Sequence, residues 1–441
     1  MKPIPKKLAI VSSHPIQYYA PIFKLLAKQQ DLIICVFYTW GEQSVSKYDP
    51  GFGREINWDI PLLDGYDFVF EKNTAKKPGS DHFMGIQNPT IIDDIKKFNA
   101  DAILIFGWAY VAHLKVLRFF KGKIPVIFRG DSNLLDTSSG IKQILKNIVL
   151  KYIYSNVDYA LFVGEANKAY FKQYGLKEEQ LIFGPHAIDN ERFSIPRLKE
   201  AGDLRTQLGI PENDILILFA GKFEGKKSPL LLKEAFIQLN DPHTHLLFVG
   251  NGVLEKSLKF KVESEKSEVR KPKSEVESGK WKVGEGINNK EQGTKRIRDD
   301  SNARLITDGQ TFSMTDRVHF MDFQNQSYMP VIYQACDLFV LPSKGPGETW
   351  GLAVNEAMAC GKAVLVSDRV GCHLDLVKNG VNGYCFKHEN LGDLTLKLQK
   401  LVGNKVHLKS FGLNSREIIK NYSFGVIVSE IRNLLANNVK K

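Results

Sequence analysis

Short runs of apolar residues alternate with longer amphipathic stretches along the first part of the chain. The first apolar run covers residues 8–11, and an amphipathic stretch at about 21–29 and a second run at 32–38 follow it. Further runs lie at 102–106, 126–128 and 159–163. Apolar runs separated by helix-like stretches are typical of βα units, whose parallel strands are covered by helices on both faces. The pattern predicts one α/β domain here.

A segment rich in turn-forming residues at 184–193 interrupts this alternation, and a second series follows it. Its apolar runs lie at 215–219, 246–249, 318–320, 338–341 and 363–366. The second series predicts a second α/β domain. We place the first domain at 1–185, a hinge at 186–204 and the second domain at 205–419.

One segment of the second domain does not fit the alternation. Residues 261–300 contain 11 Lys/Arg and 9 Asp/Glu, and the tetrad Lys-Ser-Glu-Val occurs at 266–269 and again at 273–276. A segment with so few apolar residues cannot bury enough surface to order itself. We expect a disordered charged insertion at about 260–304, with a partner-binding role as the alternative.

Composition narrows the class of protein. The chain has 441 residues, 43% of them hydrophobic, and a net charge of +11. Its five cysteines form no Cys-x-x-Cys pair, so neither a disulfide framework nor a zinc site is indicated. The apolar run near the N-terminus is too short for a signal peptide, and no stretch of about 18 apolar residues predicts a membrane span. We therefore expect a cytoplasmic protein.

The stretch 342–361 carries the most informative chemistry. It passes from the end of an apolar run, through a loop with three glycines, into a helix that begins near Leu352. Such a junction directs the backbone N–H groups of Gly351, Leu352 and Ala353 out of the carboxyl edge of the sheet, where they would stabilise a phosphate.

Charged side chains would surround this anion pocket. Glu348 in the loop and Glu356 in the helix would repel a phosphate, so we expect them to bind neutral sugar hydroxyls, and the alternative is that both are solvated surface acids. Lys222 and Lys227 follow the run at 215–219, where lysines act as point charges on phosphate. Isolated surface lysines are the simpler alternative, but their pairing with the acidic motif favours a diphosphate site.

These residues resemble the GT-B glycosyltransferases, specifically the retaining family four of nucleotide-sugar-dependent enzymes. The resemblance rests on a Glu, seven residues and a second Glu at 348–356, with an aromatic-Gly-Leu segment inside and an Ala-Met-Ala-x-Gly run after it. It continues through 367–383 and includes the two lysines and the hinge stretch 186–193. Trp350 and Lys222 stand where the family more often has Phe and Arg.

The resemblance implies an α/β fold of the GT-B type. Two Rossmann-like domains would place their parallel sheets on either side of a central cleft, and a C-terminal helix at about 420–441 would cross back to the first domain. The first domain would bind the acceptor and the second the nucleotide-sugar donor.

The same resemblance implies roles for the charged residues. Lys222 and Lys227 would hold the donor diphosphate, Glu356 would bind the ribose hydroxyls, and Glu348 would contact the transferred sugar. No Asp-x-Asp pair, the metal-binding signature of the other large glycosyltransferase fold, occurs in the sequence. We therefore expect metal-independent transfer, no metal site, and no cofactor besides the nucleotide-sugar substrate.

Two residues of the acceptor domain are candidates for the catalytic step. Asp131 follows the run at 126–128, at the position of a His-Asp segment of the family, and we expect it to orient the acceptor or act as a base. His14 follows the first apolar run and is expected near the sugar. The alternative for both is a polar loop residue. His113, within helix-like sequence, is expected to be structural.

The acceptor domain carries an excess of positive charge. Residues 101–155 contain eight Lys/Arg and three acids, and the segment 141–151 repeats apolar residues at helical spacing with lysines between them. We favour a helix that packs its apolar face on the sheet, and contact with an anionic membrane surface is the alternative. Nucleic-acid binding is not expected, because no recognised module motif occurs.

The sequence thus predicts a retaining hexosyltransferase. It would transfer a sugar from a nucleotide-diphosphate-sugar to a saccharide or lipid-linked acceptor in cell-surface polysaccharide biosynthesis, in the cytoplasm or at the inner membrane face. The alternatives are a GT-B epimerase and a non-catalytic sugar-nucleotide-binding homologue; the intact lysines and glutamates argue against the latter. A phosphorylase would need a pyridoxal-binding lysine motif, which the sequence lacks.

Overall fold

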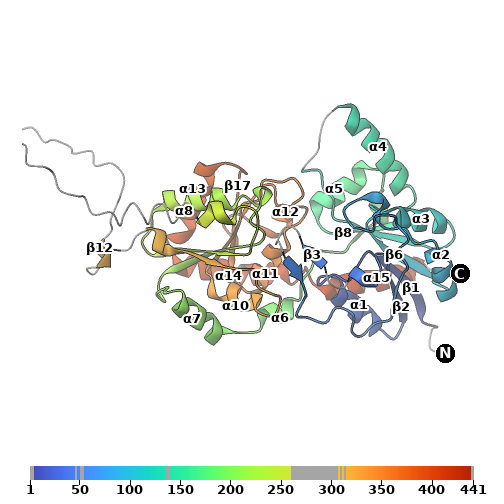
Figure 1. The fold of residues 1–441 in the computed structure, drawn as a ribbon, viewed down its shortest axis with the longest axis horizontal. Coiled ribbons are helices and arrows are strands. Elements are labelled where there is room, and N and C mark those ends of the chain that lie inside the picture. The colour runs from blue at the N-terminus through green and yellow to red at the C-terminus, as the bar shows by residue number, and fades with distance from the viewer. Residues whose placement is uncertain are drawn as a thin grey trace, which may run out of the picture.

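The computed structural model describes residues 4–44, 47–49, 54–135, 140–259, 306–307, 310–311 and 314–438. The charged insertion predicted at about 260–304 lies outside the described residues. Two α/β domains lie end to end along the long axis of the molecule (Figure 1).

A seven-stranded parallel sheet forms the centre of the N-terminal domain. Its strand order is β5-β2-β1-β6-β7-β8-β9. The inner strands are apolar at nearly every position, as expected for strands that are covered on both faces. The strands are β1 (Lys6–Ser12), β2 (Leu32–Tyr38), β5 (Phe68–Phe70), β6 (Ala102–Phe106), β7 (Val126–Arg129), β8 (Tyr159–Phe162) and β9 (Leu181–Phe183).

Helices cover both faces of this sheet. On one face the core includes Val116 and Leu117 of α3 and Phe171 of α5. On the other face Phe23 of α1 packs in the same core as Ile431 of α15, the C-terminal helix of the chain. The helices are α1 (Ala20–Ala27), α2 (Ile91–Phe98), α3 (Val111–Phe120), α4 (Ile141–Tyr154), α5 (Glu165–Gln173) and α15 (Phe424–Asn438). The predicted return of the C-terminal helix to the first domain is confirmed.

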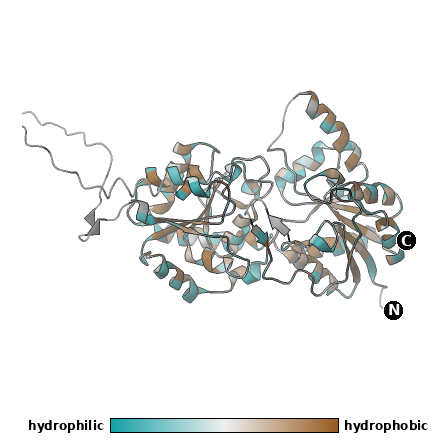
Figure 2. Cartoon of the chain, viewed as in Figure 1, coloured by the Kyte–Doolittle hydropathy of each residue, from teal (hydrophilic) through white to brown (hydrophobic). Residues whose placement is uncertain are grey.

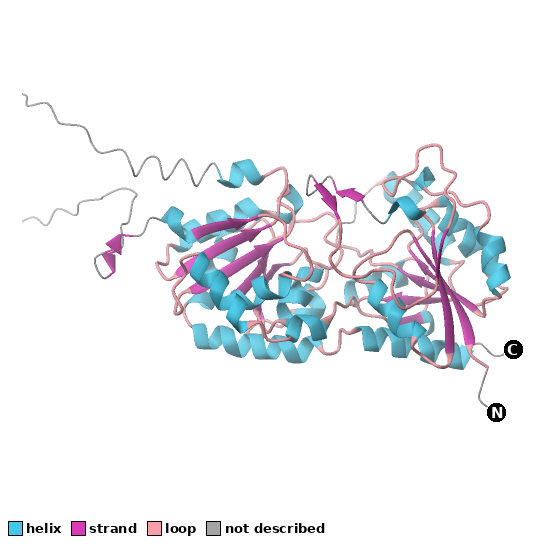
Figure 3. Ribbon diagram, turned by 60° about the horizontal axis from the view of Figure 1, so that its bottom comes forward, coloured by secondary structure: helices cyan, strands magenta, loops and turns pink. Residues whose placement is uncertain are grey.

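A six-stranded parallel sheet forms the centre of the second domain, in the order β14-β11-β10-β15-β16-β17. Figure 3 shows the strands of each domain with helices packed around them. The strands of the second domain are β10 (Ile215–Ala220), β11 (Thr244–Val249), β14 (Val318–Met321), β15 (Leu338–Leu341), β16 (Ala363–Ser367) and β17 (Gly383–Phe386). Its helices include α6 (Asn190–Ser194), α7 (Leu198–Gln207), α8 (Pro229–Leu239), α10 (Met329–Ala335), α11 (Leu352–Ala359), α12 (His373–Leu376), α13 (Leu391–Val402) and α14 (Lys405–Ile419).

The chain passes between the two domains twice. The first crossing precedes α6, and the second lies between α14 and α15. The Asn190 side-chain amide donates hydrogen bonds to the carbonyl oxygens of Ile419 and Tyr422, at 3.2 and 3.1 Å. The two crossings therefore lie side by side. Within the predicted hinge, α6 and α7 already pack in the core of the second domain.

The apolar pattern located the inner strands and missed several edge strands. β5, β9 and β17 each lie at a sheet edge and span only three or four residues. An edge strand pairs on one side only, so a short apolar run suffices, and such a run does not stand out from the loops. The short antiparallel pair β3 (Lys47–Asp49) and β4 (Arg54–Ile56) was not predicted either.

The orientation of α4 contradicts our preferred interpretation of the segment 141–151. Six large side chains spaced along one face of α4 keep between 51% and 78% of their surface exposed; they are Ile141, Ile144, Leu145, Ile148, Val149 and Tyr152. Among the α4 side chains that the structure describes, the buried ones are Leu150, Ile153 and Tyr154, near the end of the helix. The segment has two apolar stripes, and the longer one faces away from the sheet, where α4 projects from the molecule (Figure 2).

A carboxylate of the second domain contacts the first domain directly. Asp375 in α12 accepts hydrogen bonds from the backbone N–H of Glu165, at the start of α5, at 3.0 and 3.2 Å. A Cβ on Gly164 would lie 2.6 Å from the Asp375 carboxylate, so this approach requires glycine. Burial raises the pKa of Asp375 from 3.8 to about 6, although the bond from Glu165 opposes the shift.

This buried carboxylate predicts a pH dependence of stability. Between pH 3.8 and about 6 the folded protein keeps a proton on Asp375 that the unfolded chain releases, so the free energy of unfolding falls as the pH rises through this window. The expected loss is roughly 2–3 kcal/mol. Asp375→Asn keeps an acceptor oxygen and cannot ionise, so the variant should exceed the wild type by up to this amount at pH 7 and match it near pH 4.

Urea unfolding of both proteins at a series of pH values measures this difference. Glu179→Gln, which removes an exposed carboxylate of the first domain, is the control and should leave the pH profile unchanged. Parallel profiles for the wild type and Asp375→Asn would contradict the prediction.

Candidate active site

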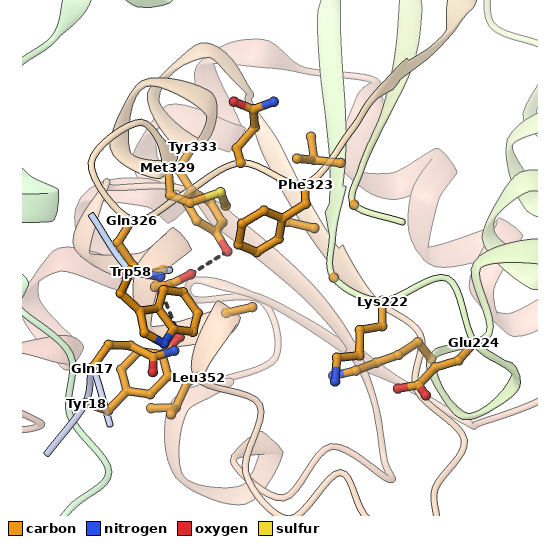
Figure 4. A pocket seen from close by; sticks show the side chains of 18 of the residues that line it. Gln17, Tyr18, Trp58, Lys222, Glu224, Phe323, Gln326, Met329, Tyr333 and Leu352 are labelled. Carbon is orange, nitrogen blue, oxygen red and sulfur yellow. Dashed lines mark hydrogen bonds between the residues drawn. The ribbon is translucent and has the colours of Figure 1, made fainter. Parts of the chain in front are cut away.

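A cavity of about 340 Å³ lies between the two domains, beside the carboxyl ends of β10 and β11. The first domain contributes Gln17, Tyr18 and Trp58 to its lining, and the second domain contributes the other residues. Those residues are Ala220, Gly221, Lys222, Glu224, Lys226, Lys227, Val249, Gly250, Phe323, Gln324, Gln326, Met329, Tyr333, Leu352, Ala353 and Glu356. Figure 4 shows Lys222 at one end of the cavity and Trp58 at the other.

Three lysines form the cationic end of the cavity. The chain leaves the buried strand β10 at Gly221, where φ is +150°, a conformation that side chains rarely adopt. A short 3₁₀ turn, Gly225–Lys227, then leads into α8 and places Lys226 and Lys227 beside Lys222. Lys226 lies 3.3 Å from Glu224. The structure thus brings both predicted phosphate-binding lysines into one cavity.

Glu348 lies behind the lysines. Its carboxylate is buried, accepts a hydrogen bond of 2.9 Å from Ser343 Oγ and forms an ion pair with Lys227. Glu348 is not among the residues that line the cavity. Lys227, which lines the cavity, thus contacts this carboxylate, and contact between Glu348 and a sugar stays a prediction.

Glu356 lies inside the cavity wall, in α11. Its buried carboxylate accepts hydrogen bonds from the hydroxyls of Tyr18, at 3.1 Å, and of Tyr333, at 2.9 Å. Tyr18 comes from the first domain, so this contact joins the two domains. Burial raises the pKa of Glu356, and the hydrogen bonds from Tyr333 and Tyr18 and the charge of Arg192 act in the opposite direction.

The start of α11 borders the cavity as the sequence predicted. Gly351 has a φ of +98°, and a Cβ there would lie 2.7 Å from Val370 Cγ1. The close packing and the backbone conformation both require glycine. Leu352 and Ala353 line the cavity. The first N–H groups of a helix have no carbonyl partner within it, so they are available to an anion.

Asp131 lies at the end of β7 and contacts the second domain. Its carboxylate accepts a hydrogen bond of 2.7 Å from Thr349 Oγ1 and lies 3.6 Å from His186 Nε2. Burial alone would raise the pKa of Asp131, but the neighbouring His186 and the hydrogen bond from Thr349 outweigh it and lower the pKa to about 2. The carboxylate is therefore ionised throughout the neutral range.

The two histidines of the first domain differ in their surroundings. His14 is half-buried, contacts Ser13 Oγ at 2.9 Å through Nδ1 and meets the edge of Trp40. His113 is fully buried, with Nε2 2.8 Å from Thr39 Oγ1, and burial lowers its pKa to about 4. The structural role expected for His113 is confirmed. His14 is not among the cavity-lining residues, and its place near the sugar stays a prediction.

Sequence reasoning missed several residues of the site. Tyr18 lies in the loop after the first strand, but its partner Glu356 is 338 positions away. Tyr333 of α10 completes the same contact, and Arg192 donates a hydrogen bond of 2.7 Å to Gln326 Oε1 in the cavity wall. Trp58 lies in a segment where no regular element was predicted. Periodicity carries no signal for such pairings.

Within the described residues, no three His, Cys, Asp or Glu side chains converge as ligands for a metal ion. Metal independence stays a prediction, and so does the absence of a cofactor.

Residues 298–422 match the family described as glycosyl transferases group 1. The match lies in the second domain and includes the motif at 348–356.

Curated relatives support the same family. An N,N'-diacetylbacillosaminyl-diphospho-undecaprenol alpha-1,3-N-acetylgalactosaminyltransferase of Campylobacter jejuni is 30% identical over 129 residues, which are 29% of this chain and 33% of the relative. A D-inositol 3-phosphate glycosyltransferase of Gordonia bronchialis is 25% identical over 220 residues, 50% of this chain and 40% of the relative. The matches thus span less than half the length of these relatives.

Solved structures resemble the whole chain. HepE of Anabaena, solved in complex with UDP and glucose, has a TM-score of 0.62 and 17% sequence identity, and the match covers 98% of this chain and 99% of HepE. WaaG, a glycosyltransferase involved in lipopolysaccharide biosynthesis, has a TM-score of 0.59 and 14% identity, covering 98% and 100%. The fold is GT-B, as the sequence predicted.

Proposed function

We propose that the protein is a retaining glycosyltransferase that transfers a sugar from a nucleotide-diphosphate-sugar to a saccharide or lipid-linked acceptor. One observation carries the proposal: one cavity between the domains is lined by three lysines and by the buried carboxylate of Glu356. A diphosphate needs the cations, and vicinal hydroxyls are suitable donors to a carboxylate. The group 1 domain of the chain supports the same activity.

The donor would lie along this cavity. Lys222, Lys227 and the first N–H groups of α11 would bind the diphosphate, and Glu356 would accept from the ribose hydroxyls. Glu348 would reach a hydroxyl of the transferred sugar from beside Lys227. The relative HepE was solved with UDP and with UDP-glucose, which favours a nucleotide sugar as the ligand class.

The reaction would proceed on one face of the sugar ring. The acceptor oxygen forms a bond to the anomeric carbon on the side from which the diphosphate leaves, the bond between that carbon and the phosphate oxygen breaks, and the leaving diphosphate takes the proton of the acceptor hydroxyl. The lysines and the helix N–H groups stabilise the charge that develops on the diphosphate.

Asp131 and His14 would act on the acceptor and the transferred sugar, whereas the lysines bind the diphosphate. A general base works best when its pKa lies near the operating pH. The pKa of Asp131, about 2, therefore favours orientation of the acceptor and stabilisation of positive charge on the sugar over proton removal. His14, beside Ser13 and Trp40, would contact the sugar.

The names of two relatives support a proposal for the class of acceptor. The Campylobacter jejuni relative is named for an undecaprenol-diphosphate-linked sugar, and a relative from Staphylococcus aureus for poly(ribitol-phosphate). We propose an acceptor of this polyanionic or lipid-linked kind, used in the assembly of a cell-surface polysaccharide.

Removal of the donor-binding groups tests the assignment. Lys222→Ala, Lys227→Ala and Glu356→Gln should each weaken the binding of UDP, GDP or ADP about tenfold or more, because hydrogen bonds to charged groups contribute roughly 1.5–3 kcal/mol. Isothermal titration measures the dissociation constants. Lys344→Ala, which removes an exposed lysine paired with Glu389, is the control and should bind as the wild type does.

Unchanged affinity in Lys227→Ala and Glu356→Gln would refute the donor site. Hydrolysis of a nucleotide sugar in the absence of acceptor distinguishes an enzyme from a non-catalytic binding homologue, because the latter binds without turnover.

We further propose that the protein works at an anionic membrane surface on the cytoplasmic side. The exposed stripe of α4 repeats apolar residues at helical spacing over three turns, and Lys146 and Lys151 on the same helix are exposed. Arg118 of α3 lies over the ring of Tyr152, at 5.8 Å. An apolar stripe flanked by cations is complementary to an anionic bilayer. Among the described residues, no helix has the length and apolar character needed to span a membrane.

Vesicle binding tests this surface. The triple variant Ile144→Ser, Leu145→Ser, Ile148→Ser should lose at least tenfold in binding to phosphatidylglycerol vesicles, because each apolar side chain gains roughly 1.5–3 kcal/mol on full burial. The control is the double variant Val406→Ser, Leu413→Ser, which removes exposed apolar residues of α14. Equal binding of the wild type to neutral phosphatidylcholine vesicles, or no loss in the triple variant, would contradict the proposal.

A further inference from the structure

The end of the cavity opposite the lysines is aromatic. The ring of Trp58, from the first domain, lies 6.3 Å from the ring of Phe323, from the second domain, with an angle of 62° between them. Met329 and Tyr333 line the same region. In Figure 4 this group lies well apart from Lys222 and Glu224.

Trp58 is held in this position by both of its neighbours in the chain. The carbonyl oxygen of Asn57 accepts a hydrogen bond of 2.7 Å from Asn325 Nδ2. The carboxylate of Asp59 accepts a bond of 3.1 Å from the backbone N–H of Ser327 and a second bond from its hydroxyl. The segment 57–59 is therefore bound to the loop between β14 and α10, across the domain boundary.

The chemical groups that line the cavity match those of a nucleoside diphosphate. Lysines suit the phosphates, the Glu356 carboxylate suits the ribose hydroxyls, and an aromatic ring suits the face of a base. Asp59, Asn57 and their partners keep the indole at the far end, where the base of such a molecule would lie.

We propose that Trp58 determines base binding by packing its indole against the nucleobase of the donor. This inference rests on the proposed donor function and assigns to it a residue from the acceptor domain. The base then contacts both domains at once, whereas the diphosphate contacts lysines of the second domain alone. A nucleoside diphosphate would hold the domains together, and inorganic diphosphate would not.

The test compares ligands with and without a base. UDP, GDP, ADP and inorganic diphosphate are titrated into the wild type, Trp58→Ala and Trp58→Phe. Stacking of a base on an aromatic side chain contributes roughly 1–3 kcal/mol by alanine substitution. Trp58→Ala should therefore weaken the tightest-binding nucleotide by about tenfold or more and change the affinity for inorganic diphosphate less than twofold. Trp58→Phe should keep most of the nucleotide affinity.

Tryptophan fluorescence provides a second measurement. If Trp58 only stabilised the fold, nucleotide binding would not change the emission of Trp58. Nucleotide binding should alter the emission of the wild type, and this change should disappear in Trp58→Phe but persist in Trp108→Phe, which keeps Trp58. Inorganic diphosphate should not produce it in any of the three proteins.

The outcomes separate this inference from the donor function. In one outcome, Lys222→Ala loses nucleotide affinity while Trp58→Ala keeps the wild-type ratio of the dissociation constants for nucleotide and inorganic diphosphate. In that case the role of Trp58 is wrong and the donor site stands. If the wild type binds none of the three nucleotides, the donor function itself is wrong. If Trp58→Ala does not fold, the fluorescence of Trp58→Phe decides: a persistent emission change overturns the inference.

Discussion

Two tyrosines from different domains donate hydrogen bonds to one buried carboxylate, and the rest of the site is arranged around this contact. Tyr18 reaches Glu356 across the cavity, while Tyr333 reaches it from α10 within the second domain. A buried carboxylate is costly unless its oxygens are hydrogen-bonded. A ligand hydroxyl that replaces the Tyr18 hydroxyl would donate a hydrogen bond to the same oxygen of Glu356. The buried carboxylate would therefore keep a hydrogen-bond partner when the ligand binds.

The contact also relates ligand binding to the position of the domains. Tyr18, Trp58 and Asp131 all belong to the first domain, and each contacts a residue of the second domain in or near the cavity. The second domain supplies most of the lining, yet its cavity is completed by the first. Ligand binding in this cavity and the contact between the domains are thus expected to depend on each other.

Much of the fold could be predicted because its inner strands are apolar at nearly every position. Residues 32–38, 102–106 and 338–341 were located with the bounds that the structure has. The edge strands β5, β9 and β17 were not located, since a strand paired on one side needs fewer apolar residues. The sequence could not predict which face of α4 packs on the domain, because the helix has apolar residues on two faces. In the structure the face with Leu150, Ile153 and Tyr154 is the buried one.

The candidate site, like the fold, could be predicted from the sequence only in part. Lys222, Lys227 and Glu356 follow strands at the carboxyl edge of one sheet, so spacing and the family motif place them together. Tyr18 and Trp58 become part of the site only when the domains meet, and no local pattern encodes a contact over 338 positions. The ion pair of Glu348 with Lys227 could not be predicted either, because the sequence motif indicates a ligand contact for each residue and not a contact between them.

The two segments in which the chain crosses between the domains limit how the domains can move relative to each other. Asn190 ties the first crossing to the carbonyl oxygens of Ile419 and Tyr422 in the second, so two covalent connections pass through one small region. A single connection would leave the domains free to swivel about it. Two connections side by side restrict this rotation, so a movement between the domains would have to turn about the region of Asn190, with α15 packed on the first domain.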